Sequence, residues 1–342
     1  MKKNTKEKGS EYIGLKECFG TTTLSFTHAL TGVLMSSMLM VYMTEYSGIS
    51  NAALLASVLL MTARIIDAVN DPIQGFIIDS SKRTKVGKYK PFFLISIIME
   101  SIAAIALFAL PNSIIDTPIL LIVWVIVFYL VYDIGSSFYK DILLYRTMSA
   151  DENQRTKLVI GPRLMSFFTG IIANIVFTIA VIALNTRGMS YHDAAAIVIL
   201  ILVASTSVIS LIGWFIVKEK HYVEEQRTEK LKLQDFFDLF HENKAMVIFA
   251  AKGLFAGFIW TLIFATPTYY IKWGFCADLT TGIADMDRFT VYSGISSVIT
   301  VVPMVLGAIL GRPLMKLFKD PVNLSCSLLT VQAIGCCILF VA

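Results

Sequence analysis

Residues 64–90 read R-I-I-D-A-V-N-D-P-I-Q-G-F-I-I-D-S-S-K-R-T-K-V-G-K-Y-K, and this stretch decides the fold. Its first half lies inside an apolar run that begins near Ala52, and its second half is a basic loop. A charged side chain in the middle of a membrane-spanning helix costs about 2.5–3.5 kcal/mol on insertion, so such residues are functional candidates. Three occur here, at Arg64, Asp67 and Asp71.

These three side chains share one face of the predicted helix. At about 100° per residue, their spacing places them within about 60° of arc, and Asn70 lies near the same face. Pro72 removes one helix hydrogen bond and favours a kink. Such a polar face must line a water-filled cavity or contact a polar partner rather than lipid. We expect Asp67 and Asp71 to face the fourth span.

The composition is typical of an integral membrane protein. The chain has 342 residues, 56% of them hydrophobic, and a mean hydropathy of +0.70. No soluble domain of this length needs so much apolar surface. About nine apolar runs, each about 20 residues or longer, are long enough to cross a bilayer. We therefore predict an all-α membrane protein with spans near residues 24–46, 53–79, 91–111, 117–144, 158–184, 194–217, 245–271, 290–312 and 324–342.

The basic residues predict the orientation. Most of the 29 Lys and Arg residues fall in the N-terminal tail and in alternate loops, which predicts a cytoplasmic N-terminus. The net charge of +4 therefore reflects topology and gives no support for nucleic-acid binding. We expect three parts: a six-helix bundle with its tail over residues 1–217, a central loop over 218–244, and three helices of a second bundle over 245–342. The central loop is expected to carry an amphipathic helix on the cytoplasmic face.

Other predicted spans also contain polar side chains. His28 in the first span is either a hydrogen-bonded packing residue or a group that titrates or binds substrate. Glu100 in the third span is a lone acid, and it is equally a candidate proton site and a partner of a neighbouring helix. The fourth span holds Asp133, Lys140 and Asp141, of which the first two are seven residues apart and are expected to share a face.

Two further pairings are expected at the predicted cytoplasmic side. Arg163 opens the fifth span about as deep as Asp141, which favours an ion pair between them. Gly75 permits close approach of a neighbouring helix. Asp79 ends the second span beside the basic residues of 82–90, and we expect a latch between this region and a neighbouring loop charge such as Arg155. Simple positive-inside anchoring is the alternative interpretation of the basic loop.

Several of these residues resemble the signature of a known family. The glycoside–pentoside–hexuronide:cation symporters, the melibiose-carrier branch of the major facilitator superfamily, are similar in the second span and its loop and, more weakly, at Pro162-Arg163 and Lys218-Glu219. The resemblance implies twelve spans in two bundles, alternating access, and sugar or glycoside uptake driven by Na⁺, H⁺ or Li⁺, with no other cofactor. The matching residues are Arg64, Asp67-Ala68, Asn70-Asp71-Pro72, Gly75, Asp79, Gly87-Lys88 and Lys90-Pro91.

The resemblance also implies roles for individual residues. Asp67 and Asp71 match the acids of the cation site, where they are the ligands of Na⁺ in a sodium-coupled carrier, with Asn70 nearby. Arg64 and Lys140 are expected charge partners. The substrate candidates are Arg163, which matches a family arginine, together with His28, Asp133 and Asp141.

Two family acids are replaced in this sequence. The additional acid of the fourth span falls at Phe138, between Asp133 and Asp141, and the sugar-site aspartate of the first span falls at Ala29, beside His28. The resemblance therefore carries cation coupling to this chain better than it carries melibiose-like sugar recognition.

Two alternatives to a carrier are also compatible with the sequence. A membrane-embedded prenyltransferase uses an N-D-x-x-D-x-x-x-D motif, which Asn70-Asp71 begins, but Gln74 and Ile78 occupy the positions of the later acids. A non-transporting scaffold made from a truncated carrier is the other alternative, because the ninth run ends at Ala342. We expect a transporter rather than an enzyme, acting as a monomer in the cell membrane, with a sugar, a monovalent cation and the lipid bilayer as its partners and no nucleic acid.

Overall fold

The computed structural model describes residues 13–47, 49 and 52–220, and beyond them only short pieces between residues 242 and 334. The backbone of the second span belongs to this description, but the side chains of Arg64 and Asp67 do not. The chain forms two compact units, residues 1–294 and 295–342. The long helices that the structure describes all lie in the first unit, between residues 15 and 216.

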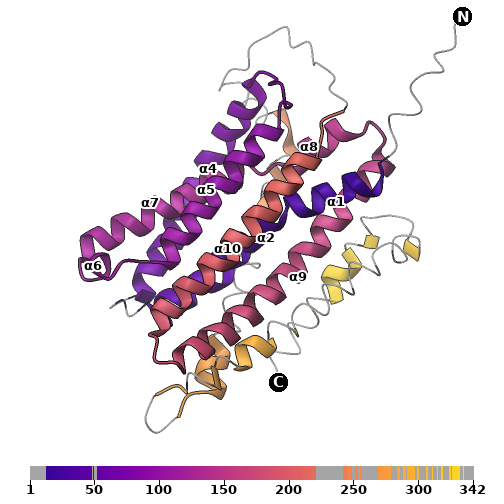
Figure 1. Cartoon of the computed structure of the whole chain (residues 1–342). Helices are drawn as coiled ribbons and strands as arrows, with labels where there is room; N and C mark the ends of the chain where they lie inside the picture. The colour runs from indigo at the N-terminus through magenta and orange to yellow at the C-terminus, as the bar shows by residue number, and fades with distance from the viewer. Residues whose placement is uncertain are drawn as a thin grey trace, which may run out of the picture. The chain divides into compact units, whose positions relative to one another are not determined.

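The described residues form an all-α bundle, as the hydropathy pattern predicts (Figure 1). Helices account for the second to sixth predicted spans, the fourth in two pieces, and each span begins and ends within about six residues of its predicted boundaries. The helices are α1 (Leu15–Leu24), α2 (Phe26–Val33), α3 (Leu39–Val41), α4 (Ala52–Ser80), α5 (Lys90–Phe108), α6 (Asn112–Ile115), α7 (Pro118–Ser137), α8 (Asp141–Met148), α9 (Glu152–Asn185) and α10 (Tyr191–Ile216), with wide π-turns η1 (Leu34–Met38) and η2 (Tyr42–Tyr46).

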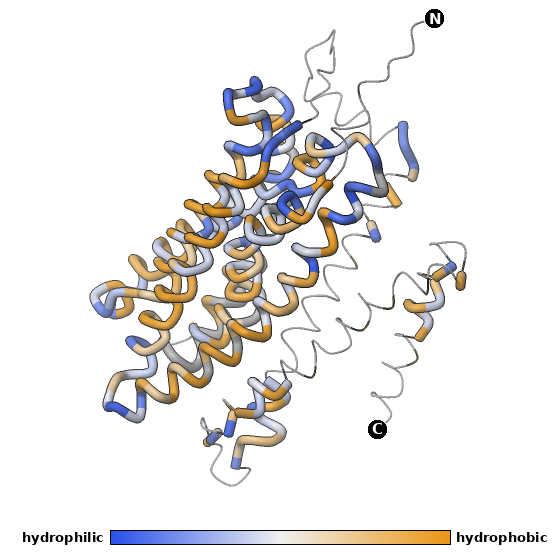
Figure 2. Tube along the Cα trace, turned by 45° about the vertical axis from the view of Figure 1, so that its right-hand side comes forward, coloured by the Kyte–Doolittle hydropathy of each residue, from blue (hydrophilic) through white to orange (hydrophobic). Residues whose placement is uncertain are grey.

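Four described segments are long and apolar enough to cross a membrane: Lys90–Phe108, Pro118–Met148, Gln154–Asn185 and Tyr191–Ile216. Figure 2 shows the distribution that this requires, with hydrophobic residues along the long helices and hydrophilic residues gathered at their turns. The third to sixth predicted spans are therefore confirmed as apolar helices. The predicted seventh to ninth spans and the predicted amphipathic helix lie largely or wholly outside the described residues.

The first span is interrupted, although its sequence predicts one continuous helix. Ser25 separates α1 from α2, and its hydroxyl donates to the carbonyl of Thr22 at 2.7 Å, a local bond that competes with helix continuation. The π-turns η1 and η2 then insert extra residues into the helical path. Such turns are rare and occur frequently at functional sites.

The fourth span is also broken, and this corrects a prediction. α7 ends at Ser137 and α8 begins at Asp141, so Asp133 and Lys140 do not share a helix face. The hydroxyl of Ser136 donates to the carbonyl of Asp133 at 3.0 Å, and the small residues at the end of α7 favour a helix end over its continuation. Of the three residues between the helices, Lys140 lies beside α4, whereas Phe138 and Tyr139 pack on the aromatic rings of Phe92 and Phe93 of α5.

Small residues set the closest helix contacts. Gly213 on α10 lies against Gly20 and Leu24 of α1, where a Cβ would overlap the α1 backbone. Gly135 on α7 lies against α5, where a Cβ would be 3.2 Å from the backbone nitrogen of Glu100. In a membrane such close approach supplies van der Waals contact that larger residues prevent. The contact at Gly135 also places the fourth span next to Glu100, the buried acid of the third span.

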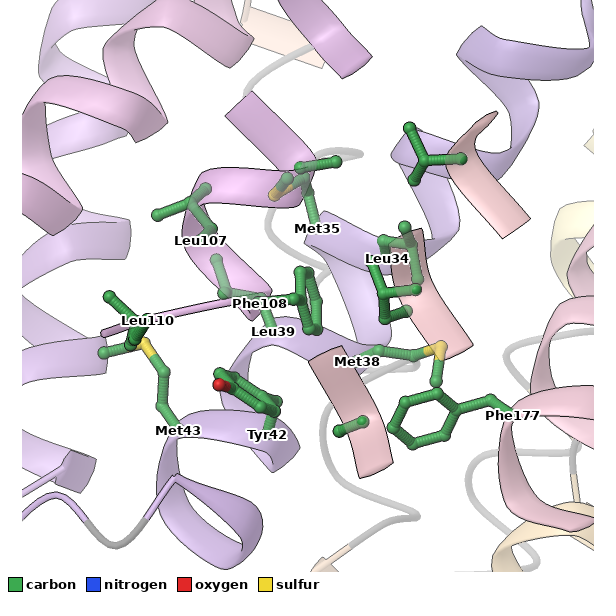
Figure 3. Packing of buried hydrophobic residues seen from close by; sticks show 14 of the residues in the cluster. Leu34, Met35, Met38, Leu39, Tyr42, Met43, Leu107, Phe108, Leu110 and Phe177 are labelled. Atoms are coloured by element: carbon green, nitrogen blue, oxygen red, sulfur yellow. The ribbon is translucent and has the colours of Figure 1, made fainter. Parts of the chain in front are cut away.

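The main hydrophobic core lies where the wide turns of the first span meet the end of α5 and the middle of α9. Leu34, Tyr42 and Phe108 are at most 1% exposed there, and Phe177 reaches this cluster from α9 (Figure 3). Tyr42 and Phe108 form a tilted ring pair with centroids 4.9 Å apart. The second half of the interrupted first span is thus held by hydrophobic packing, and His28 and Thr31 precede it in the chain.

Candidate functional site

Asp71 faces the break in the fourth span, as its position on the helix face predicts. The Ser137 hydroxyl donates to Asp71 Oδ1 at 2.9 Å, and Lys140 Nζ lies 3.8 Å from the same oxygen. The Asp71 side chain is 58% exposed, so most of its hydrogen-bonding capacity is not used by these two residues. An open carboxylate between two apolar helices is a suitable ligand for a cation or a hydroxylated substrate.

Asn70 connects the same helix to a buried acid. Its Nδ2 donates to Asp133 Oδ2 at 3.1 Å, and its Oδ1 accepts from Gln74 Nε2 at 3.0 Å. Asp133 is 7% exposed and Gln74 is 1% exposed. Within the described part of the chain, Gln74 Oε1 is buried without a hydrogen-bond partner, and a buried acceptor of this kind is costly to leave unpaired. This network of Asn70, Gln74 and Asp133 joins α4 to α7 next to Asp71.

A second polar cluster surrounds Glu100, in the middle of α5. Glu100 is fully buried, and its Oε1 lies 3.0 Å from His28 Nδ1 and accepts from Ser96 Oγ at 2.7 Å. Its Oε2 accepts a short hydrogen bond from the Thr31 hydroxyl. The imidazole of His28 stacks on the ring of Tyr139, with centroids 4.1 Å apart and planes inclined by 10°. The cluster therefore joins α2, α5 and the break in the fourth span.

Asp141 and Arg163 lie near this cluster but do not pair with each other. Both are close enough to act electrostatically on His28 and on Tyr139. Among the described residues no ion pair within 4.0 Å joins them, so the predicted ion pair is wrong in this conformation. The Asp141 carboxylate instead accepts from the backbone nitrogen of Ile142 at 2.8 Å, where it begins α8. Arg163, on α9, is exposed.

At the loop of residues 82–90 the structure shows a clamp that the sequence does not reveal. The carboxylate of Glu219 accepts from the backbone nitrogens of Lys88, Tyr89 and Lys90 at 2.9, 2.8 and 2.8 Å. These are donors at the start of α5, which have no partner within the helix. Gly87 has φ +132°, and a Cβ there would overlap the Glu219 carboxylate. Glycine is thus required both for the turn and for the clamp.

The residues on either side of Glu219 fix the same end of the bundle. The Lys220 backbone nitrogen donates to the Thr147 carbonyl at 2.9 Å, and Lys220 Nζ lies 2.6 Å from Glu17 Oε1. The hydrogen bond from Lys220 holds the pKa of Glu17 below its usual value. Trp214 Nε1 donates to the Lys90 carbonyl at 2.8 Å, with Lys90 Nζ above the indole ring. The end of α10 thereby contacts α1, α5 and α8.

The clamp is distinct from the latch predicted for Asp79 and this loop, which stays a prediction. Lys88 Nζ donates to the backbone carbonyl of Asp79 at 2.9 Å. Arg155, the example partner named for the latch, makes no ion pair within 4.0 Å with any described residue. A Cβ on Gly75 would meet no atom within 4 Å in the part of the chain that the structure describes, so no close helix approach is seen there among these residues.

The sequence placed some site residues and missed others. It identified Asn70, Asp71, His28 and Glu100 as candidates, and the structure brings them into two clusters joined by the broken fourth span. It did not identify Ser137, Tyr139 or Glu219. The run Gly135-Ser136-Ser137, in the middle of an apolar span, was the available signal for the first two. Arg64 and Asp67 lie on α4, but their side chains are outside the described residues.

Comparison with known proteins resolves the family. The model of the family described as "MFS/sugar transport protein" matches residues 21–318 of the chain. The chain belongs to this family. It is consequently a multi-pass membrane protein of a family of transporters rather than enzymes, and the prenyltransferase alternative is not supported.

Two curated relatives agree with this family. An isoprimeverose transporter of Lactiplantibacillus pentosus is 31% identical over 118 residues, which is 34% of this chain and 23% of the relative. An uncharacterized symporter, YjmB of Bacillus subtilis (strain 168), is 24% identical over 243 residues, 69% of this chain and 50% of the relative. The matched regions thus span half or less of each relative's own length.

Proposed function

We propose that the chain is part of a secondary transporter that carries a sugar or glycoside across the cell membrane, coupled to a monovalent cation, by alternating access. The observation that carries this proposal is the open carboxylate of Asp71 beside the break in the fourth span. A carboxylate retained at this depth, with one direct hydrogen bond and a distant ammonium group, has capacity left for a ligand. The names of the two relatives, one an isoprimeverose transporter and the other an uncharacterized symporter, support the same class of activity.

The proposed cation site is built on one face of α4. Asp67 and Asp71 are one helical turn apart, and two carboxylates at this spacing in a region of low dielectric repel each other. A bound Na⁺ or proton relieves that repulsion, and Asn70 supplies an amide beside it. Arg64, a turn earlier, balances the acids when the cation has left. These roles extend the polar face of α4 seen at Asn70 and Asp71.

Coupling then follows from differential binding. A sugar that binds beside the loaded cation stabilises an occluded state only when both solutes are present, and this linkage is what drives one against the gradient of the other. The break at residues 138–140 supports this role, since interrupted helices supply substrate and ion ligands in secondary transporters. His28, Asp133, Asp141 and Arg163 are the proposed substrate-side groups.

The test is transport by the full-length carrier in vesicles. An imposed Na⁺ or H⁺ gradient is combined with labelled glycosides, and accumulation is compared with exchange at equal concentrations. Asp67→Asn and Asp71→Asn are expected to abolish gradient-driven accumulation and to leave some exchange. Asp116→Asn, in the exposed turn after α6, is the matched control and should accumulate normally.

Two outcomes would overturn the proposal. Undiminished accumulation in both α4 variants would remove these acids from the mechanism. Absence of any glycoside flux in the wild-type carrier, under either gradient, would instead favour the non-transporting scaffold.

A separate experiment tests the proposed cytoplasmic N-terminus. Single cysteines introduced into the N-terminal tail are labelled in intact cells with an impermeant reagent, from which a cytoplasmic tail is protected.

A further inference from the structure

The cluster around Glu100 has a chemical property that the proposed cation site does not use. Glu100 is 0% exposed, and its partners are His28, Thr31 and Ser96. None of these carries a permanent charge, and no Lys or Arg pairs with Glu100 among the described residues. A buried carboxylate is retained only when it is paired or neutralised. Among the described neighbours, only the imidazole of His28 is able to neutralise it, and it does so only by holding a proton.

The geometry also gives that proton a route. His28 Nδ1 lies 3.0 Å from Glu100 Oε1, which is hydrogen-bonding distance, whereas the His28 side chain as a whole is 36% exposed. Within the described part of the chain, Nε2 makes no hydrogen bond. One ring nitrogen thus contacts the buried acid, and the other is left without a hydrogen bond to the described residues. Tyr139 holds the ring in this orientation by stacking on it.

We propose that His28 and Glu100 form a proton-binding site, separate from the acids of α4, and that this proton is carried in the transport cycle. In the loaded site one proton lies between Nδ1 and Oε1, and the pair has no net charge. In the released site the Nδ1–H of a neutral imidazole donates to Oε1. The incoming proton binds Nε2, and the imidazolium that forms shares its Nδ1 proton with the Glu100 carboxylate. On release, the proton leaves from Nε2 and the pair becomes a neutral imidazole with a carboxylate. No other bond forms or breaks.

Charged and titratable groups of the surrounding elements face this pair, and two of them have opposite effects on its protonation. α9 contributes Arg163, whose positive charge stabilises the deprotonated pair, and α8 contributes Asp141, whose negative charge stabilises the protonated pair. Tyr139 stacks on His28 from the break, and Tyr145 of α8 lies near Tyr139. α10 meets α2 through the hydroxyl of Ser210, which bonds Thr27. Any movement of Asp141 relative to Arg163 therefore changes the proton affinity of the pair.

The role in the cycle rests on the proposed transport function, but proton binding does not, and the two are tested separately. The first measurement is pH-difference infrared spectroscopy of the full chain in lipid vesicles without substrate. A carboxyl band that titrates is expected, absent in Glu100→Gln and shifted in midpoint by about one pH unit or more, a tenfold change in proton affinity, in His28→Gln. His192→Gln is the matched control, because His192 is a half-buried histidine that contacts Tyr42 and the Leu110 carbonyl and no carboxylate. It should leave the band unchanged.

The second measurement is proton-driven accumulation of glycoside by the full-length carrier. Glu100→Gln is expected to lose it at least tenfold while exchange remains, and His192→Gln to retain it. A carboxyl band that is identical in wild type and His28→Gln would overturn proton sharing, even if the protein transports normally. Full proton-driven accumulation in Glu100→Gln would overturn the role in transport. If Asp71→Asn alone abolishes accumulation, the proposed function stands and this inference fails.

Discussion

Glu219 and Asp71 are both single acids beside a loop or break, yet the protein surrounds them in opposite ways. Glu219 accepts from three backbone nitrogens within 2.9 Å, and a glycine of positive φ makes room for it. Asp71 accepts one hydrogen bond, lies 3.8 Å from an ammonium group and is 58% exposed. The first carboxylate uses its lone pairs to hold the fold together, whereas the second retains them.

The number and kind of hydrogen bonds that a carboxylate accepts thus distinguish structural acids from candidate binding acids without reference to function. An acceptor whose bonds all go to backbone donors contributes stability and has nothing left for a ligand. An exposed acid between apolar helices contributes little to the fold, and its presence requires another reason. Glu100 is a third case, since it is fully bonded but only by groups that are neutral or become charged by taking up a proton.

Glu219→Ala is expected to have the largest effect on stability. It leaves the donors at the start of α5 without their acceptor, and the cost is about 3 kcal/mol if each lost bond contributes about 1 kcal/mol. Thermal unfolding in detergent, followed by tryptophan fluorescence, measures the change. Glu219→Gln retains one acceptor oxygen and should lose less than half as much. Equal stability of Glu219→Ala and wild type would show that Glu219 is not a structural acid.

Gly87→Ala should cost about 2 kcal/mol, because an alanine at φ +132° is strained and its Cβ would overlap the Glu219 carboxylate. The same unfolding measurement applies. A double variant, Gly87→Ala with Glu219→Ala, tests the link between the two sites. We expect its loss to be smaller than the sum of the single losses, since the overlap disappears with the side chain. A strictly additive result would show that the two residues act independently.

Lys220→Ala is expected to cost less than about 1 kcal/mol, because the ion pair with Glu17 lies at a partly exposed end of the bundle. Glu17 precedes the first predicted span, and its pKa is held below the ordinary 4.5 by the bond from Lys220. The contribution is therefore present at neutral pH and is lost as the pH falls below about 4.5, through the lowered pKa of the folded state. The difference in melting temperature between wild type and Lys220→Ala should vanish in acid. A difference that grows on acidification would contradict the assignment.

Asp71→Asn should have the smallest effect on stability, within about 0.5 kcal/mol of wild type, because only one hydrogen bond at an exposed group changes. The same variant is expected to have the largest effect on coupling. Comparing its melting temperature with its gradient-driven uptake gives the sharpest contrast with Glu219→Ala. Strong destabilisation by Asp71→Asn would place Asp71 with the structural acids.

Hydropathy predicted the long helices because their ends coincide with changes in composition. α5 begins beside Pro91, and α10 follows Ser190, whose hydroxyl accepts from the Asp193 backbone nitrogen. The break at residues 138–140 was not predicted, because Phe138 and Tyr139 continue the apolar run. Hydropathy measures side chains and does not detect where backbone hydrogen bonds end.

The candidate site was predicted in its members but not in its pairings. The face of α4 and the lone acid Glu100 follow from the cost of polar groups in a membrane. That Glu100 meets His28, and that Asp71 meets the break, depends on helix packing at positions such as Gly135. Glu219 was missed because its partners are about 130 residues earlier in the chain, although Gly87 marked the turn that receives it.

The clamp at the start of α5 also imposes an order on biosynthesis. Lys88 and its acceptor Glu219 are 131 residues apart. At translation rates of about 5–20 residues per second, the nascent chain waits roughly 7–26 s between making the turn and making its acceptor. During that interval α5 can enter the bilayer, but the backbone N–H groups at its start must donate hydrogen bonds to water or to the insertion machinery. The clamp closes only after α10 has been synthesised, so the contacts that join its end to α1, α5 and α8 form at the moment when the central loop emerges.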